Sequence, residues 1–450
     1  MARGALLAGP SALRCPGAWG QGMATVDGVE REVLAPAVRW RIMLIGGAIY
    51  MLINLAAPFN GLVGIPVTFF LKNRLHLTSS QVALFNLWIS IPIIVGFISG
   101  FLRDRWSPFG MGDRGHLLLF GGASAVIYAA MAFINPTYAV LLAGIFLVMA
   151  VCQTALSAAA GLTSAIGQQH AMAGQMSTTL AIATSFPAFA AYLIGGALSG
   201  FIEGKDAATA ARILFLAAAA IMVLVAVFGA LGPRQLFNAA RQERGANTAL
   251  ADIKRLLKHW PIYPVLMIQI LWQFAPAMGV VLQFHMSNTL HATDAQWGEW
   301  NAIFSVSFLP VYLLYGWLCQ RVKLGWLLWA GAVITVFQMV PLLFVHTATG
   351  ALIAAAPMGA MGAIAVVALT DLTIRSCPPG LQGTMMMLYA GAYWIGLRIG
   401  DVWGANLYDR HGGFVTATLA TIGVYALVLP VLLLVPRRLL ATKDGEHVAV

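Results

Sequence analysis

The sequence predicts an all-α membrane protein in which twelve transmembrane helices form two pseudo-symmetric six-helix lobes. The first observation is composition: 60% of the 450 residues are hydrophobic, only 9% are charged, and the mean hydropathy is +0.82. A soluble domain needs more charge to cover its surface. The second is a series of apolar stretches of about 20 residues or more, the length that a helix needs to cross a bilayer. The third is one long charged interruption, residues 233–260, between the sixth and seventh stretches.

The apolar stretches define the order of the predicted elements. They place helices near residues 42–71, 79–103, 116–134, 137–166, 174–200, 209–232, 261–289, 295–320, 326–346, 350–375, 382–408 and 414–436. The predicted domains are a disordered cytoplasmic tail (1–40), an N-terminal lobe (41–232), a cytoplasmic linker (233–260), a C-terminal lobe (261–436) and a cytoplasmic tail (437–450). Leucines and an isoleucine alternate with Lys and Arg over residues 250–258, which predicts an amphipathic helix on the membrane surface.

The distribution of positive charge predicts the orientation. An even number of helices puts both termini on one side, and 20 of the 26 Lys and Arg residues fall on that side against five on the other. Positive residues are retained in cytoplasmic loops, so we expect both termini in the cytoplasm. The net charge of +10 then reflects topology and attraction to anionic lipid headgroups, not nucleic-acid binding. The four cysteines lack metal-ligand spacing, so we expect free thiols, no metal site and no cofactor.

A short motif recurs in the two halves. Gly100, Asp104 and Arg105 end the second predicted helix, and Gly316, Gln320 and Arg321 end the eighth at an offset of 216 residues. Glycine permits close helix contact, and an acidic or amide side chain can bond to the terminus of a neighbouring helix. We therefore expect both motifs to act in conformational change.

These residues resemble the cytoplasmic signature loop of the major facilitator superfamily, whose two six-helix lobes rock about a central substrate site. Further stretches are similar to the folate-biopterin transporter branch, and muropeptide and siderophore permeases are similar in the second-helix region. The stretches are Phe70–Leu77, Ser80–Phe85, Asp104–Gly110 and Arg375–Thr384. The resemblance implies that helices one, four, seven and ten line a cavity and that three, six, nine and twelve are peripheral. It also implies a monomer in a bacterial inner membrane.

Polar residues in helices one and seven are candidates for substrate binding. Helix one carries Asn54 and Asn60 among several prolines and glycines, which predicts a kink with freed backbone groups. In helix seven Gln269 and Gln273 share a face, with Trp272 beside them. Two interpretations are open in both helices, a cavity lining or packing between helices. His285, further along helix seven, is a candidate for a mouth-lining residue or a proton carrier.

The strongest site signal is in helix eleven, where Arg398 and Asp401 are three residues apart and follow Trp394. Charges within a membrane segment cost roughly 2.5 to 3.5 kcal/mol each, which a cavity or an ion pair must offset. In one interpretation the two residues form a structural pair. In the other, Arg398 binds a substrate carboxylate while Asp401 is displaced or protonated during transport. Glu299 in helix eight is a further candidate in the same outer vestibule.

Asp371 and Arg375, four residues apart in helix ten, are either a simple helix ion pair or part of an inside gate or proton-coupling site.

Together these features predict a secondary active transporter for a small anionic or zwitterionic solute, working by alternating access as a proton-coupled importer. We expect no enzyme activity, because the histidines are scattered and no cluster of His, Asp or Glu has metal or nucleophile spacing. The sequence has no nucleotide-binding motif, so the energy for transport is expected from a gradient or from the solute itself. The expected partners are the solute, a proton or other coupling ion and membrane lipids. Two alternatives are open, an exporter of drugs or metabolites and a non-transporting scaffold or sensor with the same fold.

Overall fold

The structure is a computed structural model that divides the chain into two compact units, Met1–Ile42 and Met43–Val450. It describes residues 21–26, 29–34, 36–59, 62–77, 79–203, 205–233, 237, 249–410 and 413–446. The first unit contains an antiparallel hairpin of β1 (Gln21–Val26) and β2 (Val29–Leu34), within the tail that the sequence predicts to be disordered.

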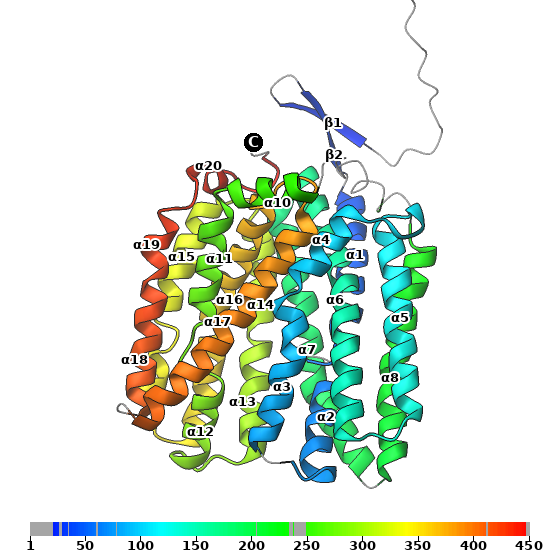
Figure 1. Cartoon of the computed structure of the whole chain (residues 1–450). Coiled ribbons are helices and arrows are strands. Elements are labelled where there is room, and N and C mark those ends of the chain that lie inside the picture. Colours follow the sequence, from blue (N-terminus) through cyan, green and yellow to red (C-terminus); the bar gives the residue numbers. More distant parts are fainter. Residues whose placement is uncertain are drawn as a thin grey trace, which may run out of the picture. The chain divides into compact units, whose positions relative to one another are not determined.

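Each of the twelve predicted membrane stretches contains helix in the structure (Figure 1). Before the linker these are α1 (Pro36–Ala56), α2 (Gly64–Phe69), η1 (Phe70–Arg74), α3 (Ser79–Ile94), α4 (Phe97–Arg105), η2 (Pro108–Gly110), α5 (Asp113–Phe133), α6 (Tyr138–Gln169), α7 (Ala173–Glu203) and α8 (Ala207–Leu231). The linker contains α10 (Ala249–Lys258), at the position predicted for the amphipathic helix. After it come α11 (Ile262–Gln273), α12 (Val280–Asn288), α13 (Asp294–Val306), α14 (Phe308–Leu318), α15 (Leu324–Val336), η3 (Val340–Phe344), α16 (Ala348–Ser376), α17 (Gln382–Arg410), α18 (Gly413–Ala426), α19 (Val428–Leu432) and α20 (Arg437–Leu440).

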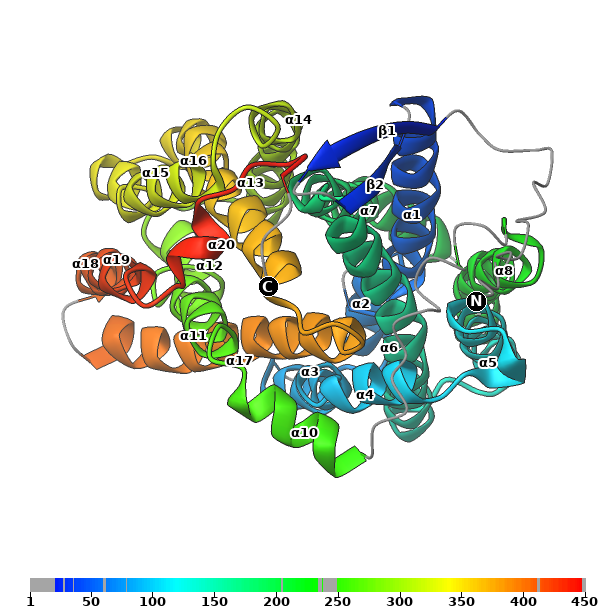
Figure 2. The ribbon, with the colours of Figure 1, turned by 90° about the horizontal axis from the view of Figure 1, so that it is seen from above.

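Apolar side chains cover the outside of the helical unit. Nine helical stretches of the described residues are long and apolar enough to cross a membrane. In Figure 2, α5 and α8 lie at one edge of the unit and α15, α18 and α19 at the opposite edge. Large apolar residues on these helices are exposed, among them Val126, Leu224 and Trp326. A surface of this kind is suited to lipid. The elements belong to the third, sixth, ninth and twelfth predicted helices, for which the resemblance implies a peripheral position.

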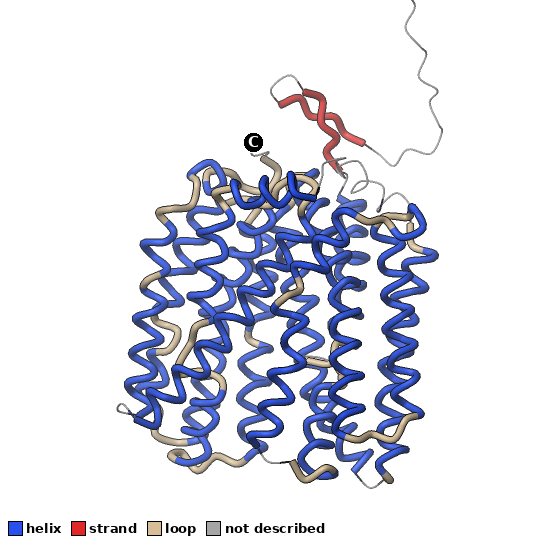
Figure 3. The backbone as a smooth tube through the Cα atoms, in the orientation of Figure 1, coloured by secondary structure: helices blue, strands red, loops and turns tan. Residues whose placement is uncertain are grey.

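Several membrane stretches are interrupted partway along their length, as the tan segments in Figure 3 show. The first predicted helix breaks between α1 and α2, near Pro58, and the seventh breaks between α11 and α12, around Pro276 and Gly279. Gly279 has a φ of +58°, a conformation that favours glycine. These two stretches occupy equivalent places in the two halves of the chain. Such breaks leave backbone groups without helical partners, and in membrane proteins they are tolerated where protein or a cavity surrounds them.

The two halves of the chain meet along several helices, most of them in contact with α7 or α17. α4 packs against α17, and α7 packs against α14 and α16. Glycines allow the close approach: a methyl group at Gly100 would lie 2.5 Å from the Gly383 carbonyl oxygen, and one at Gly316 would lie 3.2 Å from Thr178. We use "linker side" for the end of the bundle that includes the end of α4, the starts of α7 and α17, α10 and residues 437–446.

Candidate functional site

One candidate site surrounds Arg398 of α17, where three membrane stretches meet. The Arg398 guanidinium carbon lies 5.5 Å from the Trp394 ring centroid and 5.7 Å from that of Phe59, at the break after α1. Its terminal nitrogens donate to Asp401 and to Ser90 of α3, each at 3.4 Å. The Phe59 and Trp394 rings are themselves in edge contact at 4.2 Å. The result is a cation framed by two aromatic rings, an arrangement that attracts and orients a guanidinium.

The hydrogen bonds of Arg398 are weaker than those of the structural arginines. Its side chain is 31% exposed, both of its bonds are long, and its Nε is buried with no partner among the described residues. By contrast, Arg103 donates to both oxygens of Asp113 at 2.7 Å, and its side chain is 4% exposed. A guanidinium whose Nε is unused and whose terminal nitrogens form only long hydrogen bonds can bind a planar carboxylate by donating hydrogen bonds to it.

Asp401 lies against the break between α11 and α12. A methyl group at Gly279 would lie 2.6 Å from the Asp401 carboxylate, and one at Gly400 would lie 2.9 Å from the Ala275 nitrogen. The Ala277 amide, freed by the break, donates to the Thr421 hydroxyl of α18 at 2.9 Å. α17 therefore packs closely on the broken helix and keeps Asp401 beside it.

The other described residues predicted in helices one and seven have no direct bond to Arg398 in the described part of the chain. Asn54 donates to the Tyr50 carbonyl of its own helix at 2.8 Å, and Asn60 lies outside the described residues. Gln269 is buried, whereas Gln273 is half-buried and lies against Gly396 of α17. The Trp272 indole nitrogen is buried and has no hydrogen-bond acceptor among the described residues.

Two further predicted site residues, Glu299 and His285, do not contact Arg398 in the described part of the chain. Glu299 is exposed on α13. His285 of α12 stacks on Phe414 of α18, with ring centroids 3.9 Å apart and planes 1° apart. Within the described residues neither has a bond to Arg398 or Asp401.

A group of tyrosines between the halves was missed in the sequence reasoning. The Tyr312 side chain of α14 forms a hydrogen bond with that of Ser185 of α7. Tyr389 and Tyr393 of α17 lie close to it. Tyr389 also contacts Thr370 of α16 at 3.2 Å and lies near Tyr50 of α1. These hydroxyls come from stretches one, five, eight, ten and eleven, and each can donate and accept. The only sequence signal is one or a few tyrosines in each of several apolar runs, which without the fold predicts no common site.

On the linker side, the first copy of the repeated motif joins the two halves. The Asp104 carboxylate accepts hydrogen bonds from the Gly383 amide at 3.0 Å and from the Thr384 amide and hydroxyl at 2.7 Å. It therefore caps the N-terminus of α17, where the helix dipole favours a negative charge. Arg103 holds the carboxylate from the other side at 2.8 Å. Arg105 pairs with Asp252 of α10 at 2.7 Å.

The second copy of the motif has different partners. The Gln320 amide donates to the Gly316 carbonyl of its own helix at 2.9 Å and is exposed. The Arg321 guanidinium lies over the Trp317 ring at 3.8 Å. Neither side chain caps α7 as Asp104 caps α17.

Asp371 and Arg375 are buried together at the same end of the bundle. Asp371 accepts from Arg375 Nε at 2.7 Å and from the Tyr315 hydroxyl at 2.8 Å, and its side chain is 0% exposed. Arg375 also donates to Asp444 at 3.0 Å and to the Thr442 hydroxyl at 2.9 Å. The pair is therefore part of a network and is not an exposed helix pair.

Further contacts join the first half and the linker to the second half on the linker side. Gln168 of α6 donates to the carbonyls of Ile374 and Cys377 at 2.8 and 2.7 Å. In the linker, Arg255 bonds to the Pro379 carbonyl and His259 contacts the Ser376 carbonyl at 2.9 Å. Burial lowers the pKa of His259, so the imidazole is held neutral near pH 7. All these contacts close one side of the bundle.

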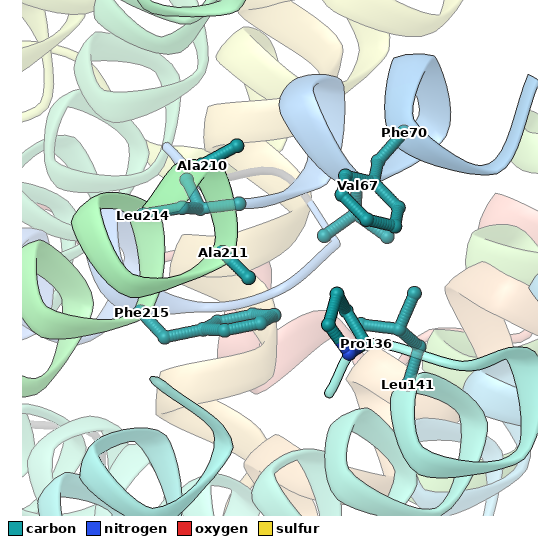
Figure 4. Close-up of a pocket in the computed structure, with 8 residues that line it drawn as sticks. All are labelled: Val67, Phe70, Pro136, Leu141, Ala210, Ala211, Leu214 and Phe215. Carbon is teal, nitrogen blue, oxygen red and sulfur yellow. The ribbon is translucent and has the colours of Figure 1, made fainter. Parts of the chain in front are cut away.

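A small pocket lies among α2, α8 and the start of α6, away from these charges (Figure 4). All eight residues that line it are apolar: Val67, Phe70, Pro136, Leu141, Ala210, Ala211, Leu214 and Phe215. These side chains offer no polar group to orient a solute, so the pocket is a weak candidate for a substrate site.

Comparison with known proteins relates the fold to solved transporters. No protein-family model matches the sequence, and no curated protein matches it. The structure is similar to the major facilitator superfamily transporter FucP in the outward conformation, with a TM-score of 0.66 and 17% identity over 88% of this chain and 98% of that one; FucP is described as the fucose:proton symporter of E. coli.

Two other similar structures belong to the same superfamily. The proton:xylose symporter XylE has a TM-score of 0.63 and 16% identity over 91% of this chain and 97% of its own. The human organic anion transporter MFSD10 has a TM-score of 0.59 and 14% identity over 88% of this chain and 100% of its own. This chain is therefore an integral, multi-pass membrane protein with the fold of the major facilitator superfamily transporters.

Proposed function

We propose that the protein is a secondary active transporter that moves a small organic anion or zwitterion across the membrane by alternating access. The observation that carries this proposal is Arg398, a membrane-embedded cation with long bonds, two flanking aromatic rings and a buried Nε that has no partner among the described residues. A buried arginine that served only structure would be expected to form short, fully paired bonds, as Arg103 does. Arg398 is instead suited to receive a carboxylate.

The transport step follows from the positions of the neighbouring groups. The solute carboxylate binds the Arg398 guanidinium and displaces Asp401, whose bond at 3.4 Å is easily given up. Asp401, released from its cation beside the broken helix, then takes a proton, which couples the solute to a proton gradient. Gln273 and the hydroxyls of Tyr389 and Tyr393 receive the polar body of the solute. The resemblance to the folate-biopterin branch supports a flat, carboxylate-bearing heterocycle as the cargo.

The direction of transport and the orientation are part of the same proposal. The linker side is cytoplasmic, because 20 of the 26 Lys and Arg residues fall on the side of the termini and the linker. The two halves act as lobes, 41–232 and 261–436, that separate on the linker side when Asp104 leaves the start of α17. The protein then releases solute to the cytoplasm as an importer, working as a monomer in a bacterial inner membrane.

Uptake measurements test the proposal. Right-side-out vesicles that contain the protein are given labelled folate, biopterin, a muropeptide, a siderophore and a neutral sugar, with and without an inward proton gradient. We expect accumulation of one of the anionic solutes, stimulated by the gradient. Accumulation of the neutral sugar alone would refute the carboxylate site, and absence of gradient stimulation would refute proton coupling.

A further inference from the structure

The segment after α20 carries a buried carboxylate that the repeated motif does not explain. The Asp444 side chain is 1% exposed, although neighbouring Lys443 and Glu446 are 42% and 46% exposed. Burying an ionised carboxylate is costly unless it is paired and hydrogen-bonded. The position of Asp444 therefore requires specific partners.

The partners of Asp444 reproduce those of Asp104 in the other half. Its two oxygens accept from the Gly174 and Gln175 amides, each at 2.9 Å. These are the second and third residues of α7, as Gly383 and Thr384 are of α17. α7 and α17 are the fifth membrane stretches of their halves. The two carboxylates thus cap equivalent helix N-termini, each from the opposite half of the chain.

The charged surroundings of the two carboxylates are also alike. Arg103 bridges Asp104 and Asp113, and Arg375 bridges Asp371 and Asp444. The titratable and charged groups that face Asp444 are Asp371 and Arg375 from α16 and Cys319 at the end of α14, while α7 presents backbone amides.

The segment around Asp444 is bonded to both halves of the chain. On the second half, the Leu324 amide donates to the Thr442 carbonyl at 3.1 Å, and the Asp444 amide donates to the Cys319 carbonyl at 3.0 Å. On the first half, the Gly445 amide donates to the Ala171 carbonyl at 2.7 Å. Gly445 has a φ of +92°, which favours glycine. The segment therefore forms a strap across the junction of α7 with α14 and α16.

We propose that Thr442–Gly445 is a second latch of the linker side, in which Asp444 performs for α7 the capping that Asp104 performs for α17. The repeated motif has Gln320 where the first copy has Asp104, and the Gln320 amide turns back onto its own helix. The acid is supplied from a different part of the chain. This inference rests on the proposed alternating access, because the latch has a role only if α7 and the second half separate.

Buried thiols near the two latches provide the test. Cys377 contacts Ser164 close to the Asp104 latch, and Cys319 lies 3.5 Å from the Asp444 carboxylate. Burial raises the pKa of the Cys377 thiol to about 12, so the closed form reacts slowly with maleimides. Each variant is measured at the thiol of the other latch, so that a local change in the pKa of the adjacent thiol does not affect the result.

The experiment uses the full-length protein in proteoliposomes, with modification by N-ethylmaleimide assigned by peptide mass spectrometry. Asp444→Asn is expected to speed modification of Cys377 about tenfold, because one of the two oxygens that accept from the α7 amides and hold the closed state is removed. The matched control is Glu446→Gln, an exposed acid of the same segment, which should leave the rate unchanged. Asp104→Asn, measured at Cys319, should show a similar acceleration.

The outcomes separate the two proposals. If Asp104→Asn accelerates modification while Asp444→Asn gives the rate of Glu446→Gln, the second latch is wrong and alternating access stands. If neither variant accelerates modification, the second latch is wrong and so is the role given to Asp104 in closing the linker side, while uptake of the solute tests alternating access separately.

If the Asp444→Asn variant does not fold, hydrogen exchange on the wild-type protein tests the second latch. In hydrogen exchange, peptides covering 171–177 and 441–446 should become exposed together, at one rate. Rapid exchange of 441–446 with 171–177 still protected would overturn the latch.

Discussion

Replacing Arg398 by alanine should impair transport far more than stability, and replacing Arg375 should do the reverse. Two charge-assisted hydrogen bonds to a carboxylate contribute about 3 kcal/mol or more in total, so Arg398→Ala should weaken solute binding by about 100-fold or more. The loss of stability should be at most about 1 kcal/mol, because the Arg398 bonds are 3.4 Å long and its side chain is 31% exposed.

Arg375 provides the matched comparison. Its side chain is 5% exposed and bonds to Asp371 at 2.7 Å, to Asp444 at 3.0 Å and to Thr442 at 2.9 Å. Removing it leaves two buried carboxylates without their cation, which costs about 3 to 5 kcal/mol in comparable cases. Arg375→Ala should therefore lower the unfolding temperature by much more than Arg398→Ala.

The two effects are measured on the same preparations. Uptake kinetics in proteoliposomes give KM and the maximal rate for the solute that the wild type accumulates, and thermal unfolding in detergent gives Tm. Arg398→Lys, which keeps the charge without the planar fork, should fall between alanine and the wild type in KM. The reasoning is refuted if Arg398→Ala leaves KM unchanged and lowers Tm as much as Arg375→Ala.

Three further predictions concern packing and pH. Gly100→Ala should push α4 and α17 apart on the linker side, because the new methyl group would lie 2.5 Å from the Gly383 carbonyl oxygen. The yield of cross-links between α4 and α17 should therefore fall. Gly279→Ala should destabilise by about 1 to 2 kcal/mol through its φ of +58°, and a Tm equal to that of the wild type would contradict this. Burial, with a smaller contribution from a neighbouring carboxylate, raises the pKa of Asp444 to about 6. The folded state then binds more protons than the unfolded state between about pH 4 and pH 6, so this group's contribution to stability should fall as pH rises through that window. Asp444→Asn should abolish that part of the pH dependence of Tm.

Composition and periodicity determined the secondary structure and the order of the membrane stretches. Lipid requires every spanning segment to satisfy its own backbone, so long apolar runs have few alternatives to helix. The same constraint makes a charge such as Arg398 conspicuous, because its cost must be offset by a partner or a cavity. The structure has α10 over the amphipathic run at 250–258. The breaks near Pro58 and Pro276 follow from the local chemistry of proline and glycine.

The tertiary structure decided which distant residues meet. Asp104 and Gly383, or Asp444 and Gly174, are separated by hundreds of residues, and nothing in their local sequence specifies the pairing. The repeated motif suggested that Gln320 would mirror Asp104, but the capping acid comes from Asp444, in the tail that follows the last membrane stretch. Sequence periodicity determines which face of a helix turns toward its neighbours. Which helix N-terminus a given carboxylate caps depends on how the two halves pack, and this packing is specified only by the folded chain.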